Sequence, residues 1–401
     1  MSAELNKKMI VNNNENTVTT KITKEMDKTK NELLEICKGL GFTKYKSKNK
    51  LQLVELIQSK NNINTSSDHK TIVETDELLA VENEYDNKLV KHLNVNKIHI
   101  SKPILKWVGG KTQILNKLID EFPIEINNYH EIFLGGGSVL LTLLSFVKNG
   151  IIIINGNIYA YDLNEPLIYT YINIQLNHNE LFNEIQKIIQ EFNSCGDGNI
   201  NRTPINIDEA IIAKENYYYW IRNAYNKLSH TDKTTTIGSA MFIFLNKTCF
   251  RGVFRVGPNG FNVPYGHYNY PEIINKKHLD EIHELIQNVI FKCCDFNTSL
   301  NNIEPDDFVY LDPPYAPETN TSFVKYTENG FNISNHIELF NLIHNNLTNT
   351  NKKIMLSNSD VSLVRDNFTN QKYNITSILC KRAINSKNPE SKAKEVIIKN
   401  Y

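Results

Sequence analysis

The sequence predicts an open, doubly wound α/β sheet, interrupted by a mostly helical insertion and preceded by a small helical module. From residue 101 onward, short apolar strands alternate with helical patterns, which is the signature of such a sheet. The alternation stops between Asn164 and about Lys277, where Tyr-rich helix-like sequence and a Gly/Pro-rich segment take its place. The 401 residues are enough for one large domain or for two to three ordinary ones.

The expected strands are short apolar runs, most of which are followed by a helical stretch. They are Glu131–Leu134, Tyr159–Asp162, Val289–Cys293, Phe308–Leu311, Lys353–Leu356, Ile375–Leu379 and Glu395–Lys399. Within the insertion, Met241–Leu245 is also strand-like. A Gly/Pro turn at residues 257–260 follows it, so Arg255 is expected on a hairpin of the insertion.

These patterns also predict where the parts of the chain begin and end. The polar, Asn-rich residues 1–20 are expected to be a disordered tail, followed by a helical module at 21–60 and an acidic linker at 61–100. The sheet domain is expected to combine residues 101–165 with residues 286–401. The remaining residues, 166–285, are the predicted insertion.

Composition limits the classes of function. Lys plus Arg and Asp plus Glu both number 44, so the formal net charge is zero. That balance argues against a purely electrostatic nucleic-acid binder, but it permits local basic patches. The six cysteines contain no Cys-x-x-Cys pair, so we expect no metal site and no secreted disulfide framework. The polar N-terminus and the short apolar runs indicate an intracellular, soluble, cytoplasmic protein without a membrane span.

The N-terminal module combines two helical patterns with a Lys-rich turn. From Lys21 to Lys60 there are ten lysines and five acidic residues, a net charge of plus five. The sequence of residues 33–57 resembles a SAP-type DNA-binding module, in which Lys44, Lys46 and Lys48 would contact phosphates. The alternative is a solvated helical hairpin that merely caps the chain.

Two glycine-rich motifs lie near the predicted start of the sheet. In Lys-Trp-Val-Gly-Gly-Lys, Trp107 offers a flat apolar face and Lys111 a charge beside glycines that let backbone approach a ligand. In Phe-Leu-Gly-Gly-Gly-Ser, Gly135 and Gly137 fall where a strand gives way to a helix, at the edge where such sheets bind ligands. Each motif alone is equally consistent with a turn that binds nothing.

Acidic residues end two of the expected strands. Asp162 closes one strand, where a carboxylate can accept hydrogen bonds from ribose hydroxyls or cap the following helix. Asp312, Pro313, Pro314 and Tyr315 follow Phe308–Leu311, and the two prolines stiffen the backbone and remove two donors. A carboxylate, free carbonyls and an aromatic ring predict a clamp for an amino group. The alternative is a turn that only ends the strand.

The four motifs, in this order and with a long insertion before Asp-Pro-Pro-Tyr, resemble those of the Dam-type (D12 class, class alpha) DNA adenine-N6 methyltransferases. Leu245–Arg255 and Gly260–Gly266 add to the resemblance, which covers about residues 101–401. It implies a Rossmann-like methyltransferase sheet with an inserted target-recognition domain. It also implies methyl transfer from S-adenosyl-L-methionine to N6 of a flipped adenine in double-stranded DNA. A cognate restriction endonuclease is a further candidate partner, and both a cellular source and a large DNA virus remain open.

The resemblance also implies roles for individual residues. The cofactor positions are Trp107, Lys111, Gly135, Gly137, Asp162, Asp295, Phe296 and Asp312. The target base would meet the Asp312 carboxylate, the Pro313 carbonyl and the Tyr315 ring. Arg255 matches a position that reads a base edge, and Arg251 is the next candidate for a contact with DNA. Relatives that read GATC often carry Asn where this chain has Arg251, which puts a GATC site in doubt.

Other readings use the same residues differently. Methylation of cytosine N4 or of a protein glutamine uses similar acceptor motifs, but often with Asn or Ser in place of Asp312. An RNA adenine-N6 methyltransferase would be separated from a DNA enzyme by tritium transfer to duplex DNA and to RNA. A catalytically inactive DNA-binding protein would fail a cofactor-binding titration, although the intact Asp-Pro-Pro-Tyr motif argues against it.

Overall fold

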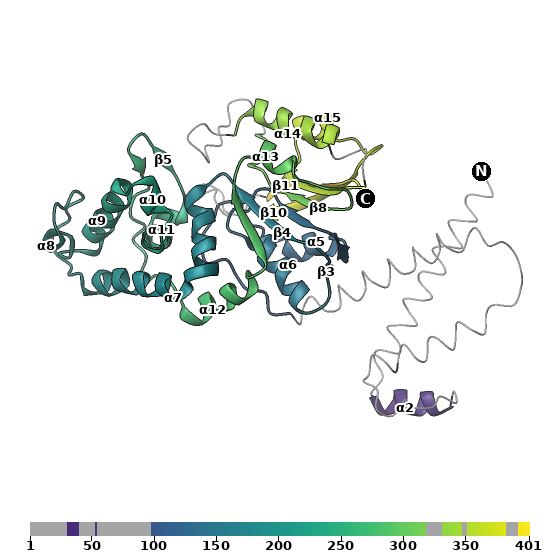
Figure 1. Cartoon of the computed structure of the whole chain (residues 1–401), viewed down its shortest axis with the longest axis horizontal. Coiled ribbons are helices and arrows are strands. Elements are labelled where there is room, and N and C mark those ends of the chain that lie inside the picture. The colour runs from purple at the N-terminus through teal and green to yellow at the C-terminus, as the bar shows by residue number, and fades with distance from the viewer. Residues whose placement is uncertain (1–29, 40–52, 54–97, 318–330, 347–350, 382–391) are drawn as a thin grey trace, which may run out of the picture. The chain divides into compact units, whose positions relative to one another are not determined.

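The computed structural model describes residues 30–39, 53, 98–317, 331–346, 351–381 and 392–401 (Figure 1). Contacts divide the chain into two compact units, Met1–Glu82 and Asn83–Tyr401. In the first unit, helix α2 (Lys30–Gly39) falls within the first helical pattern of the predicted module. It buries Leu33 and Cys37, as an amphipathic helix should. The predicted DNA-binding residues Lys44, Lys46 and Lys48 lie outside the described residues.

Seven strands of the described second unit form one sheet in the spatial order β10-β11-β9-β8-β2-β4-β7 (Figure 1). They are β2 Tyr129–Glu131, β4 Ile158–Asp162, β7 Val289–Cys293, β8 Phe308–Leu311, β9 Lys353–Ser359, β10 Asn374–Lys381 and β11 Lys392–Lys399. Neighbouring strands are parallel except at β11, which runs antiparallel to both β10 and β9. The predicted open α/β class is therefore confirmed.

Helices cover both faces of this sheet, so its strands are buried on both sides. The side chains of β8 alternate: Phe308 and Tyr310 join one hydrophobic cluster, and Val309 and Leu311 join the other. The first cluster includes residues of α5, α6 and α7, and the second includes residues of α13, α14 and α15. These helices are α5 Leu115–Asp120, α6 Ser138–Lys148, α7 Glu165–Ser194, α13 Phe296–Leu300, α14 Ile333–Asn346 and α15 Ser362–Asn367.

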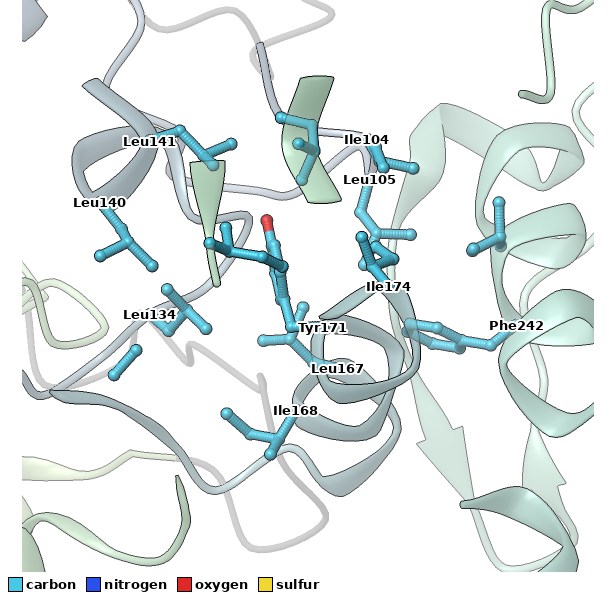
Figure 2. Packing of buried hydrophobic residues seen from close by; sticks show 14 of the residues in the cluster. Ile104, Leu105, Leu134, Leu140, Leu141, Leu167, Ile168, Tyr171, Ile174 and Phe242 are labelled. Atoms are coloured by element: carbon cyan, nitrogen blue, oxygen red, sulfur yellow. The ribbon is translucent and has the colours of Figure 1, made fainter. Parts of the chain in front are cut away.

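Between β4 and β7 the chain forms the helical segment that the sequence predicted. Its first helix, α7, bends at Asn177, where the backbone is not helical. Residues of this segment share the first hydrophobic cluster with the sheet, and Figure 2 shows Leu134, Tyr171 and Phe242 among the members. The other elements here are α8 Ile207–Ala210, α9 Lys214–Lys227, α10 His230–Lys233, α11 Thr236–Thr248, the 3-10 turn η1 Phe250–Gly252, β5 Val256–Gly257, β6 Gly260–Phe261 and α12 Lys276–Leu285.

One predicted strand is wrong: Met241–Leu245 lies inside helix α11. The helix begins after Thr235, whose hydroxyl accepts a hydrogen bond from the Gly238 N–H. Nearly every residue of the apolar run is buried, because α11 packs among α7, α9 and the loops around it. A short, continuously apolar run has no period that separates a buried helix from a buried strand. The predicted hairpin after it exists, as β5 and β6.

The bounds of strand β2 also differ from the prediction. It spans Tyr129–Glu131 rather than Glu131–Leu134. The next residues still follow the edge of their neighbours: Ile132 donates a backbone hydrogen bond to Tyr310, and Leu134 donates one to Tyr161. Ile132 and Leu134 are buried like strand residues, but the regular pairing of β2 ends before them. The chain is already turning there into the glycine-rich residues 135–137, the glycine loop. A small separate sheet pairs β1 (Glu125–Ile126) with β3 (Ile153–Ile154).

Strand β2 lies at the point where the order of the sheet reverses. From β2 the chain moves to β4 and β7 on one side, and it then returns to β8 on the other side. In open α/β sheets, ligands bind outside the carboxyl ends of the strands at this switch point. The glycine loop at 135–137 follows β2, and Asp312 follows β8. The topology thus brings two of the predicted motifs to one place.

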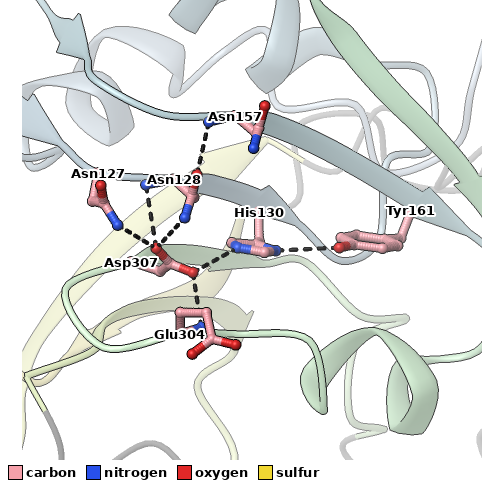
Figure 3. Close-up of polar contacts among 7 residues, drawn as sticks. All are labelled: Asn127, Asn128, His130, Asn157, Tyr161, Glu304 and Asp307. Atoms are coloured by element: carbon pink, nitrogen blue, oxygen red, sulfur yellow. Dashed lines mark hydrogen bonds and ion pairs between the residues drawn. The ribbon is translucent and has the colours of Figure 1, made fainter.

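At their amino ends, away from the switch point, β2 and β8 are joined by hydrogen bonds to a buried carboxylate, Asp307 (Figure 3). Its Oδ1 accepts hydrogen bonds from the side-chain amides of Asn127 and Asn128 at 3.1 and 2.8 Å. Its Oδ2 accepts from the Glu304 N–H at 2.9 Å and lies 3.0 Å from Nε2 of buried His130. Burial lowers the pKa of His130, although Asp307 opposes that effect. The network fixes the register of the two strands that carry the site.

Candidate active site

The two glycine motifs contact each other through Trp107. A Cβ atom added to Gly136 would lie 2.9 Å from the Trp107 Cβ, and one added to Gly135 would lie 3.0 Å from the indole ring. Gly135 and Gly137 have φ values of 51° and 72°, in the left-handed region that favours glycine. The indole also stacks on Phe254, with ring centroids 5.9 Å apart. The sequence predicted that both motifs bind a ligand, but it did not predict that they contact each other.

Asp162, at the end of β4, supports the glycine loop. Its Oδ2 accepts a hydrogen bond from the Gly135 N–H at 2.9 Å, and its Oδ1 accepts one from the Asn164 N–H at 2.8 Å. Burial raises the pKa of Asp162, and these backbone bonds oppose the rise. The helix cap that was its alternative role is filled by Asn164, which accepts from the Leu167 N–H. Because a carboxylate has about four lone-pair sites, Asp162 retains capacity for a ligand hydroxyl.

A buried ion pair joins the Lys-Trp-Val-Gly-Gly-Lys motif to the Asp-Pro-Pro-Tyr motif. The Lys111 Nζ lies 2.6 Å from the Asp312 Oδ2, and the lysine side chain is only 6% exposed. The same ammonium donates to the Gly109 carbonyl at 2.9 Å and lies 4.7 Å from the centre of the Tyr315 ring. Lys111, Asp312 and Tyr315, which the sequence predicted as site residues, therefore form one cluster.

The second oxygen of Asp312 has no partner in this cluster. Its Oδ1 is buried and accepts no hydrogen bond from any residue in the described part of the chain. Burial raises the pKa of Asp312, while the Lys111 ammonium opposes the rise. A buried acceptor without a donor is costly, about 1–3 kcal/mol, and structures keep such groups where a ligand or catalysis uses them. The arrangement can accept a hydrogen bond from a bound amine.

Three residues that sequence reasoning missed hold the Asp-Pro-Pro-Tyr segment in place. The Tyr315 hydroxyl donates to the Glu395 carboxylate of β11 at 2.9 Å. The Ala316 N–H donates to Asn358 of β9 at 2.9 Å, and the Ser359 hydroxyl donates to the Ala316 carbonyl. Sequence gives little signal for them, because the pairing of β8, β9 and β11 brings together residues more than 40 positions apart.

Glu131 is a further residue whose position the sequence did not reveal. It is 2% exposed at the end of β2 and accepts a hydrogen bond from the Tyr129 hydroxyl at 2.7 Å. Burial raises the pKa of Glu131 to about 8, and the Asp312 charge adds to the rise. One sequence feature could have identified Glu131: it is an acidic residue inside a strand that a doubly wound sheet buries on both faces.

Asp295 and Phe296 follow β7 at the same edge of the sheet. Asp295 caps helix α13, and its carboxylate accepts a hydrogen bond from the Thr298 N–H at 2.8 Å. The Phe296 ring belongs to an aromatic group with Phe133 and Phe331, whose ring centres lie 6.1 and 5.8 Å away. The pairing of Asp162 with Cys293 places this group beside the end of β4.

The two predicted DNA-reading arginines lie in the insertion. Arg255 is exposed directly before β5, where its Nε donates to the Asn262 side chain at 2.6 Å and its guanidinium also reaches the Asn262 carbonyl. Arg251 is exposed in the turn η1, with a left-handed φ of 57° that is uncommon outside glycine. Neither arginine belongs to the cluster around Asp312.

The described residues contain no group of three His, Cys, Asp or Glu side chains that could hold a metal ion. Among the helices of the described ranges, none has the length and apolar character needed to cross a membrane.

The strand order and the Asp-Pro-Pro-Tyr motif after β8 define an α/β-type methyltransferase. Residues 107–384 match the family of D12 class N6 adenine-specific DNA methyltransferases. The Type II methyltransferase M.MjaIII of Methanocaldococcus jannaschii is 36% identical over 310 residues, which cover 75% of this chain and 99% of the relative. The chain therefore belongs to the D12 class of N6 adenine-specific DNA methyltransferases.

Two more relatives extend the comparison. The Type II methyltransferase M1.LlaDCHI of Lactococcus lactis subsp. cremoris is 30% identical over 315 residues, covering 77% of this chain and 98% of that protein. A DNA adenine methylase of Haemophilus influenzae is 28% identical over 304 residues, covering 73% of this chain and 91% of that protein. The resemblance inferred from the motifs is thus confirmed for the family. The N-terminal module lies outside the residues that match the family.

Proposed function

We propose that this protein transfers a methyl group from S-adenosyl-L-methionine to N6 of an adenine flipped out of duplex DNA. The observation that carries the proposal is the Asp312 carboxylate: one oxygen is paired with Lys111, and the other is buried without a donor among the residues that the structure describes. The adenine amino group offers the missing donor. The cluster lies at the switch point of the sheet, beside the glycine loop.

The residues around the glycine loop fit such a cofactor. Gly135 and Gly137 permit close approach of a ligand to the backbone, and Asp162 retains capacity for the ribose hydroxyls. Asp295 and Phe296 would flank the cofactor's adenine ring, while Trp107 and Lys111 would complete the methionine side. When bound, the cofactor supplies a methyl group that is already activated by its sulfonium.

The protein's own residues prepare the amine. The lone pair of the adenine amino nitrogen is delocalised into the ring, so the nitrogen is a poor nucleophile. The Asp312 carboxylate and the Pro313 carbonyl would hold its two hydrogens and favour a tetrahedral nitrogen with a free lone pair. Lys111 opposes the rise in the pKa of Asp312 that burial causes, and so favours the ionised carboxylate that this role needs. Flipping costs a few kcal/mol of unstacking, which the Tyr315 ring offsets by stacking on the base.

A transfer assay with a matched binding assay tests this function. The wild-type protein should move tritium from labelled S-adenosylmethionine to N6 of adenine in duplex DNA and not to single-stranded RNA. Asp312→Ala should abolish transfer yet bind the cofactor within several-fold of wild type by calorimetry, because Asp312 acts chiefly on the amine. Transfer above a tenth of the wild-type rate in this variant would show that Asp312 does not hold the amine. Preferential labelling of RNA would refute the DNA substrate.

We also propose that residues 166–285 form the target-recognition insertion and that residues 21–60 bind DNA without sequence preference. The support for the second proposal is the net charge of the module and its Lys-rich turn. Replacing Lys44, Lys46 and Lys48 with Ser should flatten the plot of log affinity against log salt by roughly 0.9 per lost phosphate contact. An unchanged slope would mean that the module does not bind DNA.

A cognate restriction endonuclease is the protein partner that we propose, because two of the relatives are named Type II methyltransferases. DNA methylated by this protein should then resist cleavage by an endonuclease of matching site. Sequencing of modified adenines in DNA from cells that express the protein would define that site. Modification spread over unrelated sequences would argue against such a partner.

A further inference from the structure

The Tyr315 ring is held from three directions. Its hydroxyl donates to Oε2 of Glu395 at 2.9 Å, and the Lys111 ammonium lies 4.7 Å from its centre. The backbone directly after it is fixed by β9, since the Ala316 N–H donates to the Asn358 side chain. Of these contacts, only the one with Glu395 reaches the far end of the ring. It therefore decides the angle at which the ring stands.

Glu395 reaches this position because it lies on β11, which runs antiparallel to both of its neighbours in the described sheet. Glu395 is the first residue of β11 that pairs with β9, where it is opposite Ser359. Because β11 runs against its neighbours, its first residues lie at the carboxyl ends of β8 and β9, where the Asp-Pro-Pro-Tyr segment begins. The neighbouring side chain of Lys394 is exposed, whereas Glu395 is half-buried. Its carboxylate thus faces the site, while Lys394 faces solvent.

The surroundings of Tyr315 keep its hydroxyl available as a donor. Burial raises the pKa of Tyr315 well above its ordinary value, and the Asp312 and Glu395 carboxylates add to the rise. The hydroxyl thus stays protonated and donates to the Glu395 side chain.

We propose that Glu395 is a positioning residue that holds the Tyr315 ring, through its hydroxyl, at the angle needed to stack on the target base. The inference rests on the proposed function, because it concerns the base that Tyr315 would meet. Without the bond, the ring can rotate about its two side-chain torsions and lose the stacked orientation. The loss of stacking then makes the flipped state of the base less stable and leaves the binding of the cofactor unchanged.

A double-mutant cycle tests the proposal in the full-length protein. Glu395→Ala and Tyr315→Phe should each lower kcat about tenfold, the loss expected for one well-formed hydrogen bond. The double variant should be no slower than either single variant, because both remove the same bond. Glu395→Gln should restore most of the activity, since its amide oxygen can still accept from the hydroxyl. Lys394→Ala, the neighbouring exposed position, is the control and should match wild type.

A second readout follows the base directly. With 2-aminopurine in place of the target adenine, Glu395→Ala should give a smaller rise in fluorescence on binding than Glu395→Gln, while KM for S-adenosylmethionine stays within twofold of wild type. Losses that multiply in the double variant would overturn the proposal, as would a Glu395→Gln variant that is as slow as Glu395→Ala while melting at the wild-type temperature. A wild-type protein inactive on duplex DNA would instead refute the proposed function.

Discussion

The side chain of Asn246 holds the backbone of Lys106 from both sides. Its Oδ1 accepts from the Lys106 N–H and its Nδ2 donates to the Lys106 carbonyl, both at 2.8 Å. The same Nδ2 lies 3.3 Å from the Gly252 carbonyl, and a Cβ added to Gly252 would lie 2.4 Å from the Lys106 Cβ. Asn246 is buried in α11 of the insertion, and Lys106 directly precedes Trp107. This contact joins the insertion to the proposed cofactor site.

Replacing Asn246 with Ala should therefore weaken cofactor binding, although the residue lies in the insertion. The change leaves two Lys106 backbone groups without partners, which costs about 1–3 kcal/mol for each buried group. Asn226 is a matched control, because it holds both backbone groups of Phe261 in the hairpin in the same way. Calorimetry should show weaker S-adenosylmethionine binding in Asn246→Ala but not in Asn226→Ala. Equal affinities in the two variants would contradict the link.

Replacing Lys111 with Met should move the acid limb of activity to higher pH. Burial raises the pKa of Asp312, and Lys111 opposes that rise. Removing the ammonium therefore raises the pKa further, and a higher pH is needed to ionise the carboxylate. The pH profile of kcat/KM for wild type and variant measures this shift. An acid limb that stays in place, or that moves to lower pH, would show that Lys111 does not control Asp312.

Glu131 should make the protein less stable as the pH rises toward 8. Burial raises the pKa of Glu131 to about 8 in the folded protein, whereas an unfolded Glu titrates near 4.3. The folded state therefore binds the extra proton between these values, and its advantage is lost as the pH rises through about 8. Glu131→Gln should reduce the difference in Tm between pH 5 and pH 8. A variant whose Tm falls as much as that of wild type would exclude Glu131 as the cause.

Arg255 should determine a base preference. A guanidinium can donate two hydrogen bonds to guanine O6 and N7. Arg255→Ala should therefore weaken binding to the preferred site by about 1–3 kcal/mol and relax the sequence preference at one base pair. Methylation of a library randomised around the target adenine measures this. Asn262→Ala removes the side-chain partner of the guanidinium but leaves the backbone carbonyl, so it should relax the preference at the same base pair more weakly. Uniform weakening over all sequences would identify a phosphate contact, and Arg251 would become the next candidate.

Much of the site could be predicted because its chemistry is carried by short, contiguous motifs. Asp312 and Tyr315 follow an apolar strand directly, and strand β8 has the predicted bounds. Lys111 was expected beside a ligand, but its ion pair with Asp312 joins residues 201 positions apart and has no local pattern. Glu395 was missed for the same reason, because the antiparallel pairing of β11 with β9 brings it to Tyr315.

The prediction of secondary structure from local sequence was wrong where a buried, continuously apolar run has no periodicity. The run Met241–Leu245 is apolar throughout, and only its packing against α7 and α9 shows that it is helical. The predicted bounds of strand β2 were wrong for a related reason, since Ile132 and Leu134 are buried like strand residues although the chain is already turning.

By itself, the sequence determined the α/β class, the order of its motifs and the family to which the chain belongs. Alternating apolar segments, and the glycines and prolines that end them, are patterns of a few consecutive residues, so they can be recognised in the sequence alone. The tertiary structure decided which charges meet. Lys111 pairs with Asp312, Glu395 holds Tyr315, and Asn246 joins the insertion to the sheet. These contacts depend on strand order and helix packing, which arise only when distant segments bury their apolar faces against one another.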